Sequence, residues 1–98
     1  MEVEFADEDL DRLELDLQFT AGFGREIVRG FRKAMQAIRA APDEREFYSL
    51  KGLHFEKLEG ARAHQRSMRL NKQWRLILEF VGQAPNKMVR VVCIEDYH

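Results

Sequence analysis

Two runs of alternating apolar and polar side chains meet in the stretch Ser67-Met68-Arg69-Leu70-Asn71-Lys72-Gln73-Trp74-Arg75-Leu76-Ile77-Leu78-Glu79-Phe80. Such alternation predicts a half-buried β-hairpin. A two-residue turn at Asn71-Lys72 would pair Met68 with Arg75 and so mix apolar with charged positions. A three-residue loop, Asn71-Lys72-Gln73, instead pairs Met68 with Leu76 on the core face. We therefore predict the three-residue loop.

The same register sets Arg69 directly opposite Arg75 on the other face of the hairpin. Like charges in that position destabilise a sheet, by about 0.2–1 kcal/mol, unless an anion lies between them. The arginine pair therefore predicts a phosphate site. The alternative is an ordinary surface ion pair, in which Glu79, on the same face as Arg75, neutralises one of the two arginines.

A third strand is predicted downstream of the hairpin, over the apolar run from Met88 to Ile94. It leads directly into Glu95-Asp96-Tyr97-His98, which brings carboxylates, a phenol and an imidazole to the end of the sheet. These groups can transfer protons near neutral pH. We expect this end of the chain to be held in place, because it follows a strand rather than a polar tail.

Upstream of the hairpin, the pattern predicts a short strand at Val3-Glu4-Phe5 and then two helices. Asp7 can cap the first helix, whose apolar stripe is Leu10, Leu13 and Leu17. The second helix carries a core-facing stripe and ends before Pro42. That stripe consists of Ile27, Phe31, Ala34, Met35 and Ile38.

Length and composition favour one compact domain over residues 1–98, with 45% hydrophobic residues. The single cysteine, Cys93, excludes a disulfide framework and fits a reduced, cytoplasmic setting. No run of about 18 apolar residues predicts a membrane span, and the acidic amino terminus argues against a secretory signal.

The charge is unevenly distributed along the chain. Residues 1–16 contain eight acidic side chains and one basic side chain, Arg12, so the rest of the chain is net positive. This asymmetry indicates either a surface for a polyanion or an ordinary solvated face.

Three motifs carry a resemblance to a known family. They are Phe55-x-x-Leu58-x-Gly60-x-Arg62, then Gln65-x-Ser67-x-Arg69-x-Asn71-x-Gln73-Trp74-Arg75, and the ending Asp96-Tyr97-His98. Together they resemble the HigB-type toxins of bacterial toxin–antitoxin modules, which belong to the RelE/ParE superfamily. Residues 1–50 match only in architecture, as two helices before a sheet.

The resemblance implies an α+β, RelE-like fold with two N-terminal helices packed on a small twisted antiparallel sheet. It also implies the toxin of a type II module, an mRNA endonuclease that acts on the translating ribosome, needs no metal or other cofactor and arrests growth. Its partner would be a HigA-like helix-turn-helix antitoxin, through which the toxin meets operator DNA. An RNA strand supplies its own nucleophile, the 2′-hydroxyl, so the protein has to orient it, transfer protons and stabilise the phosphorane.

The family match assigns a role to each candidate site residue. His98 is the expected general acid or base, Arg75 the group that binds the scissile phosphate, Tyr97 a stacking or hydrogen-bonding platform, and Asp96 its orienting partner. Four further cations are expected to bind backbone phosphates: Arg69, Lys72, Lys57 and Arg62.

The chain departs from the family in one loop, where Glu56 and Glu59 precede Gly60 and His64 stands where a second glycine is common. That loop cannot inherit a catalytic role by position. His54 is interpreted as a surface or packing residue, with a place in the site as the alternative. Two other functions stay open: a gyrase-poisoning ParE-like toxin, and a catalytically weak toxin that acts mainly as co-repressor with its antitoxin.

Overall fold

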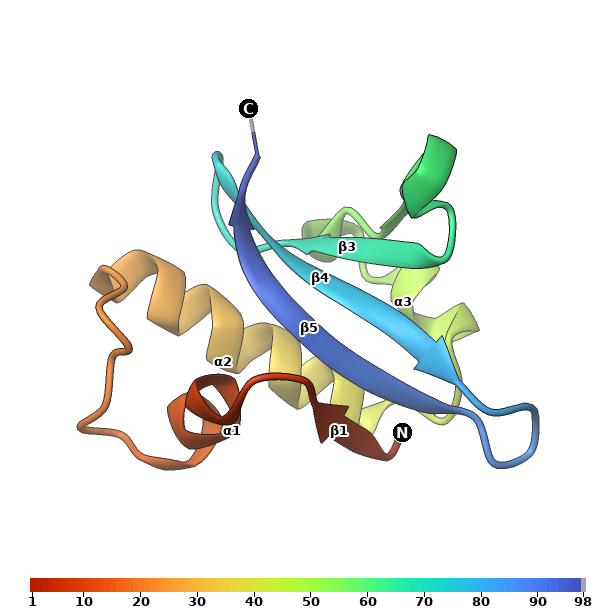
Figure 1. The fold of residues 1–98 in the computed structure, drawn as a ribbon, viewed down its shortest axis with the longest axis horizontal. Coiled ribbons are helices and arrows are strands. Elements are labelled where there is room, and N and C mark those ends of the chain that lie inside the picture. The colour runs from red at the N-terminus through yellow and green to blue at the C-terminus, as the bar shows by residue number, and fades with distance from the viewer. Residues whose placement is uncertain (98) are drawn as a thin grey trace.

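The computed structural model describes residues 1–97. Its helices are α1 (Glu8–Leu15), α2 (Arg25–Ala40) and α3 (Arg45–Ser49), with two 3₁₀ turns, η1 (Lys51–Leu53) and η2 (Gly60–Arg62). Its strands are β1 (Val3–Phe5), β2 (Glu56–Lys57), β3 (Gln65–Arg69), β4 (Trp74–Val81) and β5 (Met88–Asp96). The long strands form a curved sheet, and α1 and α2 pack against one face of it (Figure 1).

The sheet is mixed, with the strand order β1-β5-β4-β3-β2. The α+β class is confirmed, but the expectation of a purely antiparallel sheet is wrong, because β1 pairs parallel to β5 with Val3 opposite Val89. The chain between β1 and β5 includes every helix and the other strands. A connection of that length can return the chain in the same direction, which a tight hairpin cannot do.

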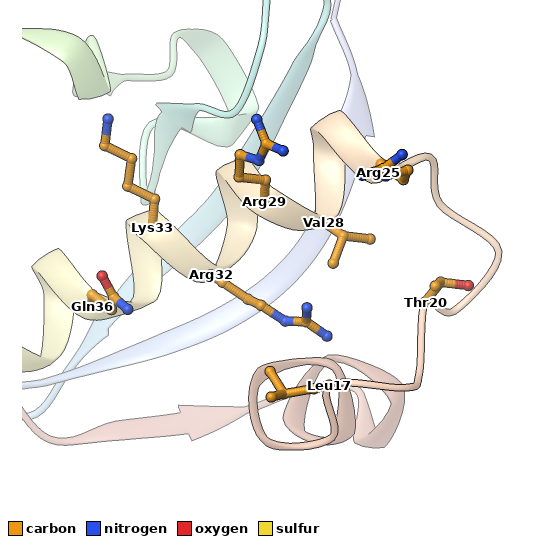
Figure 2. Close-up of a pocket in the computed structure, with 8 residues that line it drawn as sticks. All are labelled: Leu17, Thr20, Arg25, Val28, Arg29, Arg32, Lys33 and Gln36. Atoms are coloured by element: carbon orange, nitrogen blue, oxygen red, sulfur yellow. The ribbon is translucent and has the colours of Figure 1, made fainter.

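The first helix is shorter than its apolar pattern predicts. Leu10 and Leu13 are buried as expected, but α1 ends at Leu15 and Leu17 is 75% exposed. Arg32 of α2 explains this end, because it donates to the backbone carbonyls of Leu13, Asp16 and Phe19 and so satisfies groups that a longer helix would have used. Figure 2 shows Arg32 pointing from α2 toward Leu17.

The number of helices also differs from the prediction of two, because α3 and the two 3₁₀ turns fill the connection between α2 and β3. The α3 helix buries Phe47, whose ring lies 5.3 Å from that of Phe55. None of the helices in residues 1–97 has both the length and the apolar character needed to cross a membrane.

The second helix matches its prediction closely. It ends at Ala40, two residues before Pro42, and its whole predicted stripe is buried: Ile27, Phe31, Ala34, Met35 and Ile38. Phe31 and Ile38 are completely inaccessible. Each such side chain contributes about 1.5–3 kcal/mol to folding, so this stripe is a main part of the core.

The hairpin register is confirmed. Met68 lies opposite Leu76 and Arg69 opposite Arg75, and the backbone N–H of Leu70 donates to the carbonyl of Trp74 across the three-residue loop. Asn71 closes that loop, since its side-chain oxygen accepts the backbone N–H groups of Gln73 and Trp74 at 2.8 and 2.7 Å.

Gly30 brings α2 close to the end of this hairpin. A β-carbon at Gly30 would lie 2.4 Å from the carbonyl oxygen of Leu70 and 3.0 Å from its carbonyl carbon. Because both atoms belong to the backbone, they can yield only if the helix and the hairpin move apart. The packing of α2 on the sheet therefore requires glycine at this position.

We expect Gly30→Ala to lower the free energy of unfolding by about 1–3 kcal/mol, because the overpacking outweighs alanine's better helix propensity. Thermal unfolding followed by circular dichroism measures the change. Gly52→Ala is the matched control, since a β-carbon there meets no atom within 4 Å. A Gly30→Ala protein as stable as the Gly52→Ala protein would contradict the close approach.

Candidate functional site

Three cross-strand neighbours form the centre of the candidate site. Arg75 on β4 lies directly opposite Arg69 on β3 and opposite Glu95 on β5. Residues paired in this way share one face of a sheet, so the three side chains stand side by side. The ring of Tyr97 lies 5.7 Å from the guanidinium carbon of Arg75. The structure thus brings two predicted catalytic residues and one predicted RNA-binding residue together.

Arg75 is fixed in place by neutral partners. Its Nε donates to the hydroxyl of Ser67 at 2.8 Å, and its Nη2 donates to the backbone carbonyl of His54. The residue is only 9% exposed, and burial lowers the pKa of Arg75, partly offset by the charge of Glu56. An arginine remains charged despite such a shift. A guanidinium has more N–H donors than these contacts use, so Arg75 can still bind a planar anionic group.

His54 lies between the two arginines. Its backbone adopts the left-handed conformation, with φ 45° and ψ 53°, and its ring Nε2 lies 3.3 Å from Nη1 of Arg69. Since a guanidinium only donates, a hydrogen bond there requires Nε2 without a proton. Left-handed backbone is costly for residues other than glycine, and Arg75 holds this one through the His54 carbonyl.

This position favours the alternative interpretation of His54, a place in the candidate site, because its ring contacts Arg69 and its carbonyl contacts Arg75. The side chain is exposed, but both flanking residues, Leu53 and Phe55, are buried and fix the segment against the core. The sequence predicts that burial pattern, because the residues on either side of His54 are apolar. The contact with Arg69 could not be predicted, because it depends on how the segment after α3 returns to the sheet.

The end of β5 is held by the hairpin loop. The backbone N–H of Tyr97 donates to the carbonyl of Gln73 at 2.7 Å, and the Gln73 side chain donates to Asp96 at 2.9 Å. The expectation that this end is held in place is confirmed as far as Tyr97. Gln73 was missed as a site residue, although it stands in the family motif. The proposed acid or base, His98, lies outside the described residues.

The four predicted RNA-binding cations lie in different surroundings. Arg69 belongs to the centre of the site and also donates to the Asn71 carbonyl at 3.1 Å. Lys72 is exposed in the hairpin loop, and Lys57 lies on β2 at the sheet edge, opposite Arg66. The structure therefore groups Arg69 with Arg75 and keeps Lys57 farther along the sheet.

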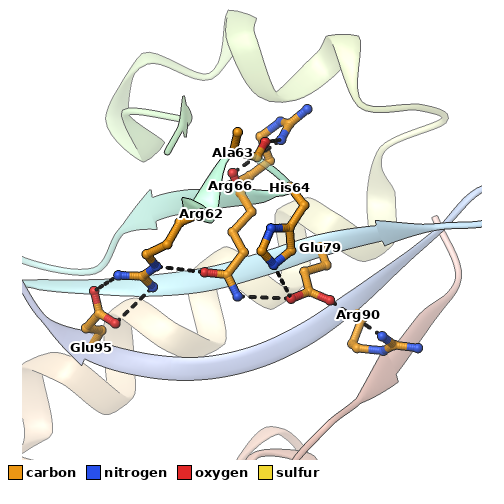
Figure 3. A network of polar contacts seen from close by, with 8 residues as sticks. Arg62, Ala63, His64, Arg66, Glu79, Arg90 and Glu95 are labelled. Atoms are coloured by element: carbon orange, nitrogen blue, oxygen red, sulfur yellow. Dashed lines mark hydrogen bonds and ion pairs between the residues drawn. The ribbon is translucent and has the colours of Figure 1, made fainter. Parts of the chain in front are cut away.

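Arg62 already has an anionic partner. Its two terminal nitrogens each donate to a carboxylate oxygen of Glu95 at 3.0 Å, and its Nε donates to Gln65 at 2.9 Å (Figure 3). The hydrogen bonds that Arg62 donates to the Glu95 carboxylate raise the pKa of Arg62. Because Glu95 directly precedes Asp96, this ion pair holds β5 beside the site.

Glu79 does not neutralise either of the paired arginines by a direct contact. Its carboxylate accepts from Gln65 at 2.9 Å and lies 3.6 Å from His64 and 3.5 Å from Arg90 (Figure 3). The ordinary ion pair that was the alternative for the arginines is thus formed with Arg90. Arg69 and Arg75 instead bind carbonyl and hydroxyl oxygens, which leaves their positive charge uncompensated by Glu79.

Other reactive groups are poorly placed for chemistry. Burial raises the pKa of the Cys93 thiol, which makes it a weak nucleophile at neutral pH. Within residues 1–97, histidine, cysteine and carboxylate side chains nowhere gather in a group of three or more that could hold a metal ion. The arrangement around Arg75 is suited to binding a phosphodiester beside an imidazole and a phenol.

Comparison with known proteins gives a family match and a structural match. A family model described as the RelE-like toxin of type II toxin–antitoxin system HigB matches residues 3–98. Among solved structures, the YoeB/ParE toxin from Agrobacterium tumefaciens is similar with a TM-score of 0.62 and 16% sequence identity, over 100% of both chains. At that identity the likeness shows the shared fold alone. No curated protein matches the sequence.

Proposed function

Since this chain belongs to the HigB family of RelE-like toxins of type II toxin–antitoxin systems, we propose that it is an endoribonuclease that cleaves messenger RNA. The observation that carries this proposal is the cross-strand pair Arg69 and Arg75 with His54 against both of them. Two buried or half-buried guanidinium groups beside an imidazole are suited to a phosphodiester. The fold alone would not support this activity, because one fold can host several functions.

The reaction we propose is attack by the 2′-hydroxyl on the adjacent phosphorus. The 2′-oxygen–phosphorus bond forms and the phosphorus–5′-oxygen bond breaks, which leaves a 2′,3′-cyclic phosphate and a 5′-hydroxyl. Arg75 would bind the non-bridging oxygens, whose negative charge grows in the transition state. Ser67 and the His54 carbonyl hold its guanidinium in advance, so little reorganisation is needed during the reaction.

Two protons have to move in this reaction. One leaves the 2′-hydroxyl and one reaches the departing 5′-oxygen. His98 remains our candidate for one of these transfers, and the position of His54 against Arg69 supports it as the candidate for the other. Tyr97 would stack on a base or donate a hydrogen bond to the phosphate, with Asp96 and Gln73 holding it in position.

Membership of a type II system implies a protein antitoxin as partner. We propose that this antitoxin is a HigA-like helix-turn-helix protein and that the toxin meets operator DNA only through it. We further propose that cleavage takes place in the cytoplasm on the translating ribosome, where messenger RNA is exposed codon by codon. The cations Arg69, Lys72, Lys57 and Arg62 would bind phosphates along the RNA, and Arg62 would first have to share its contact with Glu95.

The second candidate is a ParE-like toxin directed against gyrase, because one fold can host several functions. A gyrase poison would not need His54, Arg69 and Arg75 to converge on one site. The catalytically weak toxin that acts as co-repressor remains the third possibility, and it too gives no reason for this convergence.

Induction of the chain in bacteria should produce new RNA 5′ ends inside reading frames, with a 5′-hydroxyl and a cyclic phosphate at the two sides of each cut. Sequencing of 5′ ends in induced and uninduced cells measures this, and an Arg75→Ala strain is the control. DNA breaks without new RNA ends would favour the gyrase poison. The absence of both would favour the co-repressor.

A further inference from the structure

A groove of about 470 Å³ opens beside the candidate site, between α2, the η1 segment and the end of the β3–β4 hairpin. Its floor is apolar and includes Ala34, Ala37, Leu50, Leu53 and Leu70. Gly30 and Leu70, which approach each other closely, both line the groove. Small residues on α2 leave the space above this floor unfilled.

Three cations stand around this floor: Lys33 on α2, Lys51 on η1 and Arg69 on β3. Lys33 and Lys51 are both exposed. Figure 2 shows Lys33 projecting from the side of α2 that faces away from α1, together with Arg29. None of the described residues that line the groove is acidic. A surface with an apolar floor and only positive charge at its rim is complementary to a polyanion that also carries apolar groups.

The groove is continuous with the candidate site through Arg69. This side chain lines the groove and also contacts His54, which in turn accepts from Arg75. A phosphate bound by Arg69 and Arg75 therefore lies at the mouth of the groove. Lys51 and Lys33 line the same groove as Arg69.

We propose that this groove binds the nucleotide next to the scissile phosphate of a single-stranded RNA, with its base against Leu50 and its phosphates on Lys33 and Lys51. The inference rests on the proposed ribonuclease function and extends it to a second subsite. Proteins that bind single-stranded RNA commonly combine a cationic track along the backbone with side chains that contact the bases, most often aromatic or arginine side chains. An acidic peptide would match the charges but would not use the apolar floor in the same way.

The test is binding of a pool of fluorescent eight-nucleotide RNAs with 2′-O-methyl groups, which lack the attacking hydroxyl and cannot be cut. Lys33→Ala and Lys51→Ala should each raise Kd by about threefold to tenfold. Each should also reduce the slope of log Kd against log salt by about 0.7, the effect of one lost phosphate contact on a single strand. Arg45→Ala is the control, because it removes the same charge from a side chain that is 88% exposed and paired with Asp43.

Unchanged Kd and salt slope in both lysine variants would overturn the subsite, and so would a parent chain that does not bind the pool. An antitoxin peptide whose binding depends on Lys33 and Lys51, while RNA binding does not, would assign the groove to the antitoxin instead. Because the assay needs no cleavage, failure of the subsite can be distinguished from failure of the proposed ribonuclease function. A chain that binds RNA through both lysines but makes no cuts in cells would retain the subsite and refute the ribonuclease.

Discussion

An Arg75→Ala variant should cleave messenger RNA at least about 100-fold more slowly than the parent chain. The guanidinium of Arg75 is held by Ser67 and by the His54 carbonyl before any substrate arrives. Groups held in advance toward a developing negative charge commonly contribute most to such reactions. Cleavage of a defined message in a reconstituted translation reaction, at saturating toxin, measures the rate.

The same substitution also has a structural cost. It leaves the Ser67 hydroxyl and the His54 carbonyl without their donor, and we expect a loss of about 1–3 kcal/mol of stability. Ser67→Ala separates the two effects, because it weakens the support of the guanidinium but keeps its charge in the site. The rates are therefore compared at a temperature where circular dichroism shows all three proteins folded.

Arg75→Lys gives a second comparison. Lysine keeps a positive charge but cannot reproduce the planar donor set that reaches Ser67, His54 and a phosphate together. We expect most of the activity to be lost in this variant as well. If folded Arg75→Ala cleaved within threefold of the parent, Arg75 would have no part in binding the scissile phosphate.

Local patterns in the sequence predicted the hairpin and, with it, the arginine pair at the centre of the candidate site. The pairing of Arg69 with Arg75 follows from the two-residue period of the strands and from the length of the loop between them. Both features depend only on residues close to the loop in the sequence. The buried stripe of α2 was predictable for the same reason, because a period of 3.6 identifies one face of a helix.

The parts that could not be predicted depend on contacts between distant segments. The parallel pairing of β1 with β5 joins the two ends of the chain, and no local pattern specifies it. The early end of α1 depends on Arg32, which lies in another helix. The ion pair between Arg62 and Glu95 could not be predicted either, because the basic segment around Arg62 contains no pattern that indicates an acidic partner on β5.

His54 illustrates the same limit inside the site. Its place against Arg69 requires α3 and η1 to return the chain to the sheet, and neither short element was predicted. The left-handed backbone of His54 also has no signal in the sequence, since glycine is the residue expected there. The site therefore combines a predictable arginine pair with a histidine that only the tertiary fold supplies.

A His98→Ala variant should cleave messenger RNA about 100-fold to 10,000-fold more slowly, the range expected for loss of a positioned general acid or base. The reason lies in its neighbours: the Tyr97 backbone is bound to Gln73, and the Tyr97 ring lies 5.7 Å from the Arg75 guanidinium carbon. Tyr97, the residue that precedes His98 in the sequence, is thus held beside the guanidinium that we propose binds the scissile phosphate. Single-turnover cleavage of the same message measures the loss.

The pH dependence of the rate distinguishes a proton-transfer role from a structural one. If His98 and His54 carry out the two transfers, the parent chain should show a bell-shaped profile, and each single alanine variant should flatten a different limb. Gln73→Ala is the positioning control, because it removes the side-chain donor to Asp96 at 2.9 Å while leaving both imidazoles in place. It should slow cleavage without changing the shape of the profile. A His98→Ala protein that keeps both limbs and most of its rate would exclude His98 from the chemistry and leave His54 as the only described imidazole against the arginine pair.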